Sequence, residues 1–194
     1  MARGGQGLAR VAVVVRAGAA PLWWLGVLAA GVGACVPGLT GRRIGVLGGA
    51  ALFVVAVAAV AYTRRRRYAA LARSAARAGK HDVLQDRAVT ARNWRRGHRW
   101  WLLLAFLAAV GSAFAAPAAG GMLLAGCGVG LWLKAAWVGR LERAADVLLW
   151  VRVDWLTKSA GRPAGKAVKA YRSTGIAAGD AAPGGKPRKT AALV

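Results

Sequence analysis

The chain has 194 residues, of which 29 are Lys or Arg and only six are Asp or Glu, so its formal net charge is +23 at pH 7. Hydrophobic residues nevertheless make up 57% of it, and 27 of the 29 basic residues fall in three stretches that alternate with long uncharged segments. This segregation argues against a soluble globular domain and predicts an integral membrane protein whose basic segments lie outside the bilayer.

The chain begins with a basic N-terminal segment, residues 1–16, which is followed by two uncharged segments at 17–41 and 44–63. At 1.5 Å per residue, about 20 apolar residues in a helix cross a hydrocarbon core of roughly 30 Å. Each segment fits one crossing, and we expect a first transmembrane hairpin over residues 17–63. Buried helices of a soluble protein are the less favoured alternative, because such helices rarely run about 20 residues without a polar face.

Residues 64–99 form the predicted basic cytoplasmic loop, with twelve Lys and Arg side chains against two acids, Asp82 and Asp86. A short helix is expected to continue from the second span to Gly79, a typical helix stop. Asp82 and Gln85 have the spacing of a capping box, which predicts a second helix from 83 to about 96. The side chains expected to bind nucleic acid or anionic lipid are Arg64, Arg65, Arg66, Arg67, Arg73, Arg77, Lys80, Arg87, Arg92, Trp94, Arg95, Arg96 and Arg99.

The next uncharged segment, 100–133, would be about 51 Å long as one helix, which is too long for a single crossing. Pro117 lies near its middle and predicts a turn, so we expect a second transmembrane hairpin over 100–138, with Lys134 reaching toward the interface. Small residues four apart let helix backbones approach closely. Such pairs predict packing of the spans, or contacts between copies, at Gly45 and Gly49, Gly121 and Ala125, and Gly126 and Gly130.

The remainder of the chain is expected to stay in the cytoplasm. Leu141, Ala144, Leu148, Val151 and Trp155 recur at helical spacing and predict a cytoplasmic amphipathic helix over 139–160. After Gly161 the composition turns to Gly, Pro, Ala and Lys, which predicts a flexible basic tail over 161–194. The predicted fold class is therefore all-α: four transmembrane helices in two hairpins, with basic cytoplasmic helical segments.

The distribution of Lys and Arg also predicts an orientation, because these residues concentrate in cytoplasmic segments. Three precede the first span, twelve lie in 64–99 and twelve lie from 134 onward, whereas the connection at 38–43 holds two and the turn near Pro117 none. Both termini and the central loop are expected in the cytoplasm, and the protein in the inner (cytoplasmic) membrane as a multi-pass protein. Six Trp residues near the predicted cytoplasmic span ends agree: Trp23, Trp24, Trp100, Trp101, Trp132 and Trp137.

No constellation of residues in the sequence predicts catalysis. Cys35 and Cys127 are each alone in a span, so neither a disulfide nor a metal site is expected. His81 and His98 are lone residues in basic segments, so we expect solvated loop histidines. The stretch from Gly161 to Lys166 departs from a phosphate-binding loop in its spacing and lacks the Ser or Thr that would hold magnesium. We expect a non-enzymatic protein without a cofactor.

Three kinds of anionic partner fit the basic segments. Anionic lipid head groups attract Lys and Arg by about 1 kcal/mol per residue near the surface. Nucleic acid offers phosphates for Arg and Lys and bases on which Trp can stack. An acidic protein partner is the third. The sequence favours lipid and DNA equally, because a basic patch fits either partner.

In its small size, Ala-, Gly- and Arg-rich composition and basic cytoplasmic segments, the chain resembles the plasmid spread proteins of mycelial actinobacteria. The resemblance covers architecture and composition without a diagnostic motif, and it implies a DNA-associated component of a conjugative plasmid transfer assembly, with a DNA translocase as partner. A pore-forming or membrane-perturbing effector and a lipid- and protein-binding membrane scaffold are the alternatives.

Overall fold

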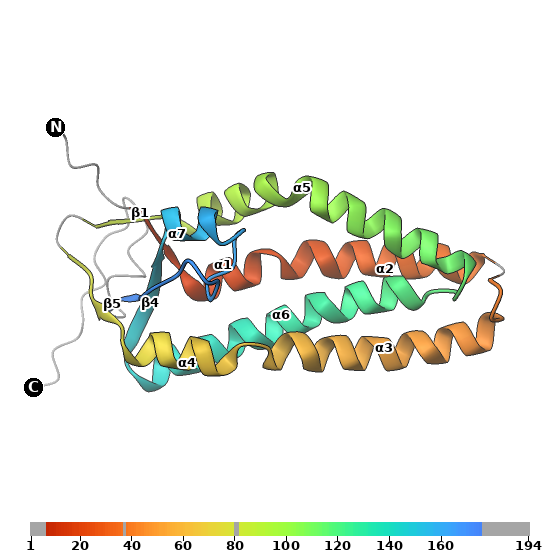
Figure 1. Ribbon diagram of the computed structural model, residues 1–194, viewed down its shortest axis with the longest axis horizontal. Helices are drawn as coiled ribbons and strands as arrows, with labels where there is room; N and C mark the ends of the chain where they lie inside the picture. The colour runs from red at the N-terminus through yellow and green to blue at the C-terminus, as the bar shows by residue number, and fades with distance from the viewer. Residues whose placement is uncertain (1–6, 37, 80–81, 176–194) are drawn as a thin grey trace, which may run out of the picture.

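The computed structural model describes residues 7–36, 38–79 and 82–175. Four helical rods run side by side as an elongated bundle (Figure 1). The first rod is α1 (Val11–Ala17) followed by α2 (Ala19–Cys35), and the second is α3 (Arg42–Tyr62) followed by α4 (Arg65–Arg73). The third is α5 (Arg87–Gly111), and the fourth is α6 (Ala119–Ala144). Helix α6 packs on α2, on α3 and on α5, so it forms the centre of the bundle.

A five-stranded mixed sheet lies at one end of the bundle, and the two hairpin turns lie at the other (Figure 1). Its strands are β1 (Gly7–Arg10), β2 (Ala76–Arg77), β3 (Val83–Leu84), β4 (Val147–Arg152) and β5 (Arg172–Gly175), in the order β2-β5-β4-β1-β3. The central strand β4 is antiparallel to β1 and β5, with Leu8 opposite Arg152 and Leu149 opposite Ser173. The outer pairs, β1 with β3 and β2 with β5, are parallel. We call this end of the molecule the cap; it also includes α1, α4 and α7 (Val153–Lys158).

The sheet corrects the all-α prediction, because the protein is a mixed α/β fold. The predicted helix over 139–160 is instead the end of α6, strand β4 and the short helix α7. Asp146, between α6 and β4, has a φ of 52°, a left-handed conformation that a continuing α-helix cannot contain. The apolar run Val147–Arg152 then becomes the buried central strand, and its fit to a helical period was coincidental.

Two further boundaries differ from the sequence prediction. Helix α4 ends at Arg73 and leads into β2, so no helix continues to Gly79. The helix predicted from 83 begins at Arg87, where the Asp86 carboxylate accepts a hydrogen bond from the Arg87 N–H at 2.6 Å, and it runs without a break to Gly111. Asp82 serves the preceding loop instead, accepting a hydrogen bond from the Gly79 N–H at 2.8 Å.

The predicted flexible tail is folded as far as residue 175. Tyr171 is fully buried, its hydroxyl donates a hydrogen bond to the Pro163 carbonyl at 3.0 Å, and β5 follows directly. Burial raises the pKa of Tyr171, so this hydroxyl stays protonated and remains a donor. The rest of the predicted tail, 176–194, lies outside the described residues.

Three helices are long and apolar enough to cross a membrane by length and composition: Val11–Cys35, Arg42–Arg73 and Ala119–Ala144. This corrects the prediction of four. Helix α5 is continuous and runs along the bundle toward the turn at Pro117. Its first half carries Arg95, Arg96 and Arg99, so only its second half, from Trp100, is apolar. The predicted turn at Pro117 lies between α5 and α6, which begins at Ala119.

The small residues singled out for packing all lie at helix interfaces around α6. A Cβ atom at Gly126 would lie 2.6 Å from the Phe53 carbonyl oxygen of α3, and one at Gly49 would lie 2.8 Å from Met122 Sδ of α6. Gly45 faces Pro117, Gly130 faces Val60, Gly121 faces Ala30 and Ala125 faces Gly26. Only glycine permits these approaches without displacing a neighbouring backbone or side chain.

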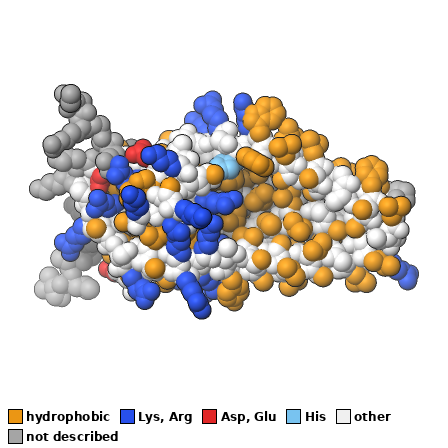
Figure 2. Space-filling model, viewed as in Figure 1, with side chains coloured by type: hydrophobic (Ala, Val, Ile, Leu, Met, Phe, Trp, Pro, Cys, Tyr) orange, Lys and Arg blue, Asp and Glu red, His pale blue; other side chains and the backbone are white. Residues whose placement is uncertain are grey.

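The two halves of the molecule bury different kinds of side chain. Small residues fill the bundle, whereas its large apolar side chains point outward, between 56 and 72% exposed at Trp24, Leu28, Leu47, Val55, Trp101 and Leu104. The cap has the opposite arrangement, with Leu8, Val11, Val151 and Tyr171 fully buried. In Figure 2 the hydrophobic side chains cover the bundle and the Lys and Arg side chains gather over the cap. A large apolar surface over a core of small residues is typical of helices in lipid, and an apolar core of large residues is typical of a domain in water.

Candidate functional site

The basic residues predicted to bind an anion lie on two separate rods. Arg64 to Arg67 stand at the break between α3 and α4, Arg73 ends α4 and Arg77 lies in β2, whereas Arg87 to Arg99 lie on the first half of α5. Lys80 lies outside the described residues. Residues 64–99 therefore form α4, two short strands and the first half of α5, and their basic side chains do not form one continuous surface.

On α5, four arginines lie on the face opposite Trp94 and His98. At about 100° per residue, Arg92, Arg95, Arg96 and Arg99 fall within one arc of about 100°. We call these four exposed side chains the α5 arginine stripe. Trp94 and His98 lie on the other face and point inward, with their rings stacked at 4.3 Å between centroids. The stripe is free to contact an anion, and Trp94 is not available to stack on a base.

On α4, several of the predicted arginines instead hold other parts of the cap. Arg64 Nη1 donates to the Ala164 carbonyl at 3.1 Å, and Arg67 Nη2 donates to the Gly165 carbonyl at 2.9 Å. The guanidinium of Arg65 lies over the rings of Tyr62 and Trp137, at 4.1 and 5.2 Å from their centroids. Arg64 and Arg67 therefore hold the loop before β5 against α4, and all three arginines place positive charge at the junction of the cap and bundle.

Sequence reasoning missed a basic groove that the N-terminal segment completes. Arg10 and Arg16 from β1 and α1 line it together with Arg87 and Arg95 from α5 and Arg143 from α6, and its volume is about 1020 Å³. In the sequence, the N-terminal arginines predict only the orientation of the chain. Nothing in their spacing indicated that α1 would bring them beside α5.

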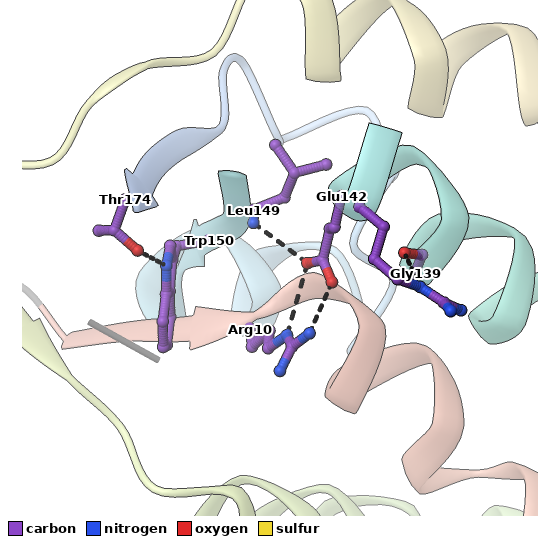
Figure 3. A network of polar contacts seen from close by, with 7 residues as sticks. Arg10, Gly139, Glu142, Leu149, Trp150 and Thr174 are labelled. Atoms are coloured by element: carbon purple, nitrogen blue, oxygen red, sulfur yellow. Dashed lines mark hydrogen bonds and ion pairs between the residues drawn. The ribbon is translucent and has the colours of Figure 1, made fainter. Parts of the chain in front are cut away.

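Within this groove, Glu142 is almost fully buried and makes a three-way junction (Figure 3). Arg10 Nη2 lies 2.7 Å from its Oε2, and the Leu149 N–H donates to its Oε1 at 3.1 Å. These contacts join β1, α6 and β4. Trp150, the next residue of β4, donates from Nε1 to Thr174 Oγ1 at 2.8 Å and thereby joins β5. Glu142 is accordingly a structural residue, which neutralises Arg10 at the base of the groove.

A second cavity, of about 640 Å³, lies where the cap meets the bundle on the face shown in Figure 2. It is lined by α1, the α3–α4 break, α5, α6 and the loop 160–164. Three basic side chains line it, Arg64, Lys134 and Arg162, and in the described part of the chain no Asp or Glu does. Lys134 was expected to reach the membrane interface, but it is only 7% exposed and points into this cavity. We call it the Lys134 cavity.

Most of the remaining Trp residues contact other side chains of the protein, which favours a packing role over ligand binding. Trp23 and Trp132 contact each other at 6.1 Å between ring centroids, near the level where the cap begins. Trp155 lies under the Arg152 guanidinium at 5.1 Å, and Trp150 is buried in the sheet. Trp100 and Trp101 are exposed where the apolar half of α5 starts.

The described residues place basic side chains on exposed surfaces and along two cavities. Among residues 7–36, 38–79 and 82–175, no cluster of His, Cys, Asp or Glu could hold a metal ion. Cys35 and Cys127 are both free thiols. No protein family, curated protein or solved structure matches this chain.

Proposed function

We propose that this chain is a non-enzymatic integral protein of the cytoplasmic membrane, whose cap lies on the cytoplasmic side and binds anionic phospholipid head groups. The observation that carries the proposal is the reversal of burial between bundle and cap. Strands β1 and β5 belong to one sheet, so both ends of the described chain are on the same side. The excess of Lys and Arg in the cap supports the cytoplasm as that side.

The α5 arginine stripe supports head groups as the anion. The head-group region adds roughly 5–7 Å to each side of the hydrocarbon core. If Trp100 marks the edge of that core, Arg99, Arg96 and Arg95 lie within about 8 Å of it along the helix axis, and Arg92 lies about 12 Å away. Long arginine side chains extend this reach. Most of the stripe therefore falls at the depth of lipid phosphates.

DNA binding is the second candidate, and a different pair of residues favours it. Arg73 lies about 15 Å beyond the end of α3 along the rod, and Arg77 follows in β2. Both are exposed and lie beyond the head-group region. This is the version implied by the resemblance to plasmid spread proteins. A pore through a single copy is disfavoured, because α6 fills the bundle centre with close glycine contacts.

The test uses two variants of equal net charge. The first replaces the α5 arginine stripe by Gln, and the second replaces four exposed basic residues elsewhere in the cap by Gln: Arg73, Arg77, Lys158 and Lys166. Each protein is reconstituted from an equimolar mixture of phosphatidylglycerol and phosphatidylcholine, washed in detergent and assayed for retained lipid. We expect the stripe variant to lose at least about fivefold of the phosphatidylglycerol enrichment and the second to retain it.

Equal lipid retention by both variants and the wild type would contradict the lipid proposal. The same proteins in phosphatidylcholine nanodiscs are then titrated with duplex DNA at increasing salt. Binding with a steep salt dependence that the Arg73 and Arg77 variant loses would support the DNA candidate instead. Extraction of the wild type from membranes by alkaline carbonate would contradict membrane insertion itself.

A further inference from the structure

The Lys134 side chain is largely buried against the cavity, and no carboxylate of the described residues pairs with it. Within the described part of the chain, the Lys134 ammonium forms no hydrogen bond or ion pair, and the centroid of the Tyr68 ring lies 5.9 Å from its Nζ. Arg64 and Arg65 lie nearby and add positive charge. Burying an ammonium costs several kcal/mol unless an anion or several acceptors compensate it. Within the described part of the chain no anion supplies this compensation, so an anion that enters the cavity would supply it.

The other cationic groups converge on the same space. Arg64, at the start of α4, has a φ of 62°, a left-handed conformation that is uncommon for a residue other than glycine, and its guanidinium lines the cavity. Arg162, in the loop 160–164, also lines the cavity and is exposed. The loop that carries it is held by His98, whose Nε2 lies 3.2 Å from the Ala160 carbonyl oxygen. Three basic side chains from three elements therefore surround one space.

The cavity also has an apolar side that opens toward the bundle surface. Val60 of α3, Leu131 of α6 and Trp101 of α5 line this side, and Trp101 is 72% exposed. Helices α3 and α5 each pack against α6 but not closely against one another, and the cavity, which both helices line, is open to the surface. Figure 2 shows the hollow with Lys and Arg side chains on its cap side and hydrophobic side chains on its bundle side. Its volume of about 640 Å³ lies in the range of small-molecule sites.

We propose that the Lys134 cavity is a binding site for a single anionic phospholipid. Its phosphate contacts Lys134, Arg64 and Arg162, and its acyl chains leave the cavity between α3 and α5. This site is distinct from the α5 arginine stripe, because Trp94 and His98 separate the two on opposite faces of the helix. The proposal rests on the proposed membrane placement, since the opening has to face lipid.

The test compares Lys134→Met with Lys158→Met, which removes an exposed lysine of α7 outside the cavity. Thermal unfolding of the full chain is followed in neutral detergent micelles with and without phosphatidylglycerol. A ligand that binds only the folded state stabilises it by mass action. At a lipid concentration about 100-fold above the dissociation constant, we expect the wild type and Lys158→Met to gain about 5–10 °C in Tm. Lys134→Met should gain at most a third of this.

The lipid-free proteins supply a second readout. Replacing a buried, uncompensated cation by an apolar side chain of similar length should raise the Tm of Lys134→Met above that of the wild type without lipid. A lower Tm for Lys134→Met, together with an undiminished response to lipid, would overturn the proposal and make Lys134 a structural residue. Stabilisation of the wild type by inorganic phosphate alone, to the same extent as by lipid, would overturn the lipid assignment and indicate a soluble phosphate ligand.

Membrane placement is tested separately by flotation of the wild type with phosphatidylcholine liposomes. Failure to float would contradict the membrane placement on which the site depends. Flotation of both wild type and Lys134→Met, with no difference in their response to phosphatidylglycerol, would leave the placement intact and overturn only the site.

Discussion

Replacing Glu142 by Gln should destabilise the cap more than any exposed charge substitution of the same kind. The side chain is 2% exposed and accepts from Arg10 at 2.7 Å and from the Leu149 N–H at 3.1 Å. Gln keeps the volume, and its carbonyl oxygen can still accept from Leu149. The substitution therefore isolates the charge, and it leaves the Arg10 guanidinium partly buried without an anion.

The magnitude follows from the burial of the two partners. Removing one partner of a fully buried ion pair costs about 3–5 kcal/mol. The Arg10 side chain is 21% exposed and can recover part of its hydration, which lowers the expected cost to about 2–3 kcal/mol. For a chain of this length that corresponds to a fall in Tm of about 4–12 °C. Near-ultraviolet circular dichroism in detergent micelles measures it, since Trp150 lies beside the junction in β4.

The matched control is Asp154→Asn, which breaks a pair with Arg152 whose carboxylate is 66% exposed. Such a pair contributes between 0 and about 1 kcal/mol. The double variant Arg10→Met with Glu142→Gln should recover part of the loss, because it removes the unpaired guanidinium as well. If Glu142→Gln costs no more than Asp154→Asn, the ion pair does not fasten β1 to α6, and our account of the cap is wrong.

Three further predictions address packing, the folded C-terminal strand and orientation. Gly126→Val should lower the free energy of unfolding by about 1–3 kcal/mol, because the valine side chain would collide with α3. Gly48 faces open space, so Gly48→Val should change this free energy by less than about 0.5 kcal/mol. Unfolding in detergent measures both. Tyr171→Phe should cost about 1–2 kcal/mol in the same assay, since it leaves a buried carbonyl without its donor, and a neutral result would contradict the folded loop before β5. In a background without Cys35 and Cys127, Leu39→Cys in the α2–α3 turn should react with an impermeant maleimide on intact cells, and Arg73→Cys in the cap should react only after permeabilisation; the reverse pattern would invert the proposed orientation.

The helices of the two hairpins were predictable because their signals are local. Long uncharged segments, Pro117 and the glycines four apart act within a single rod or turn, and the structure places them at helix turns and contacts. The sheet was not predictable in this way. Its outer strands β2 and β3 have two residues each, and its pairings join β1 to β4 across more than a hundred residues. No periodicity within one segment reports such a pairing.

The candidate site shows a second limit of the sequence. Counting charge identified the arginines of α4 and α5 but could not separate those that bind backbone carbonyls, such as Arg67, from those of the exposed α5 stripe. Lys134 was assigned to the interface because it ends an apolar stretch. Its burial follows from α1, α4 and the loop 160–164 folding around it, and this long-range packing leaves no trace in the local sequence.

Strands β1 to β4 of the sheet are joined directly to the helices of the bundle. Strand β1 leads directly into α1, α4 leads into β2, β3 leads into α5, and α6 leads into β4. Each of the four rods is therefore continuous with its own strand of one hydrogen-bonded sheet (Figure 1). A rod cannot shift along its axis without changing the register of that sheet, and a one-residue slip would exchange the side chains of β4 between its two buried faces. The cap thereby holds the ends of the rods in fixed relative positions, including those of α4, α5 and α6 around Lys134. A basic cavity between rods that are fixed in this way is preorganised, so an anion that enters it does not have to order the surrounding side chains and backbone first.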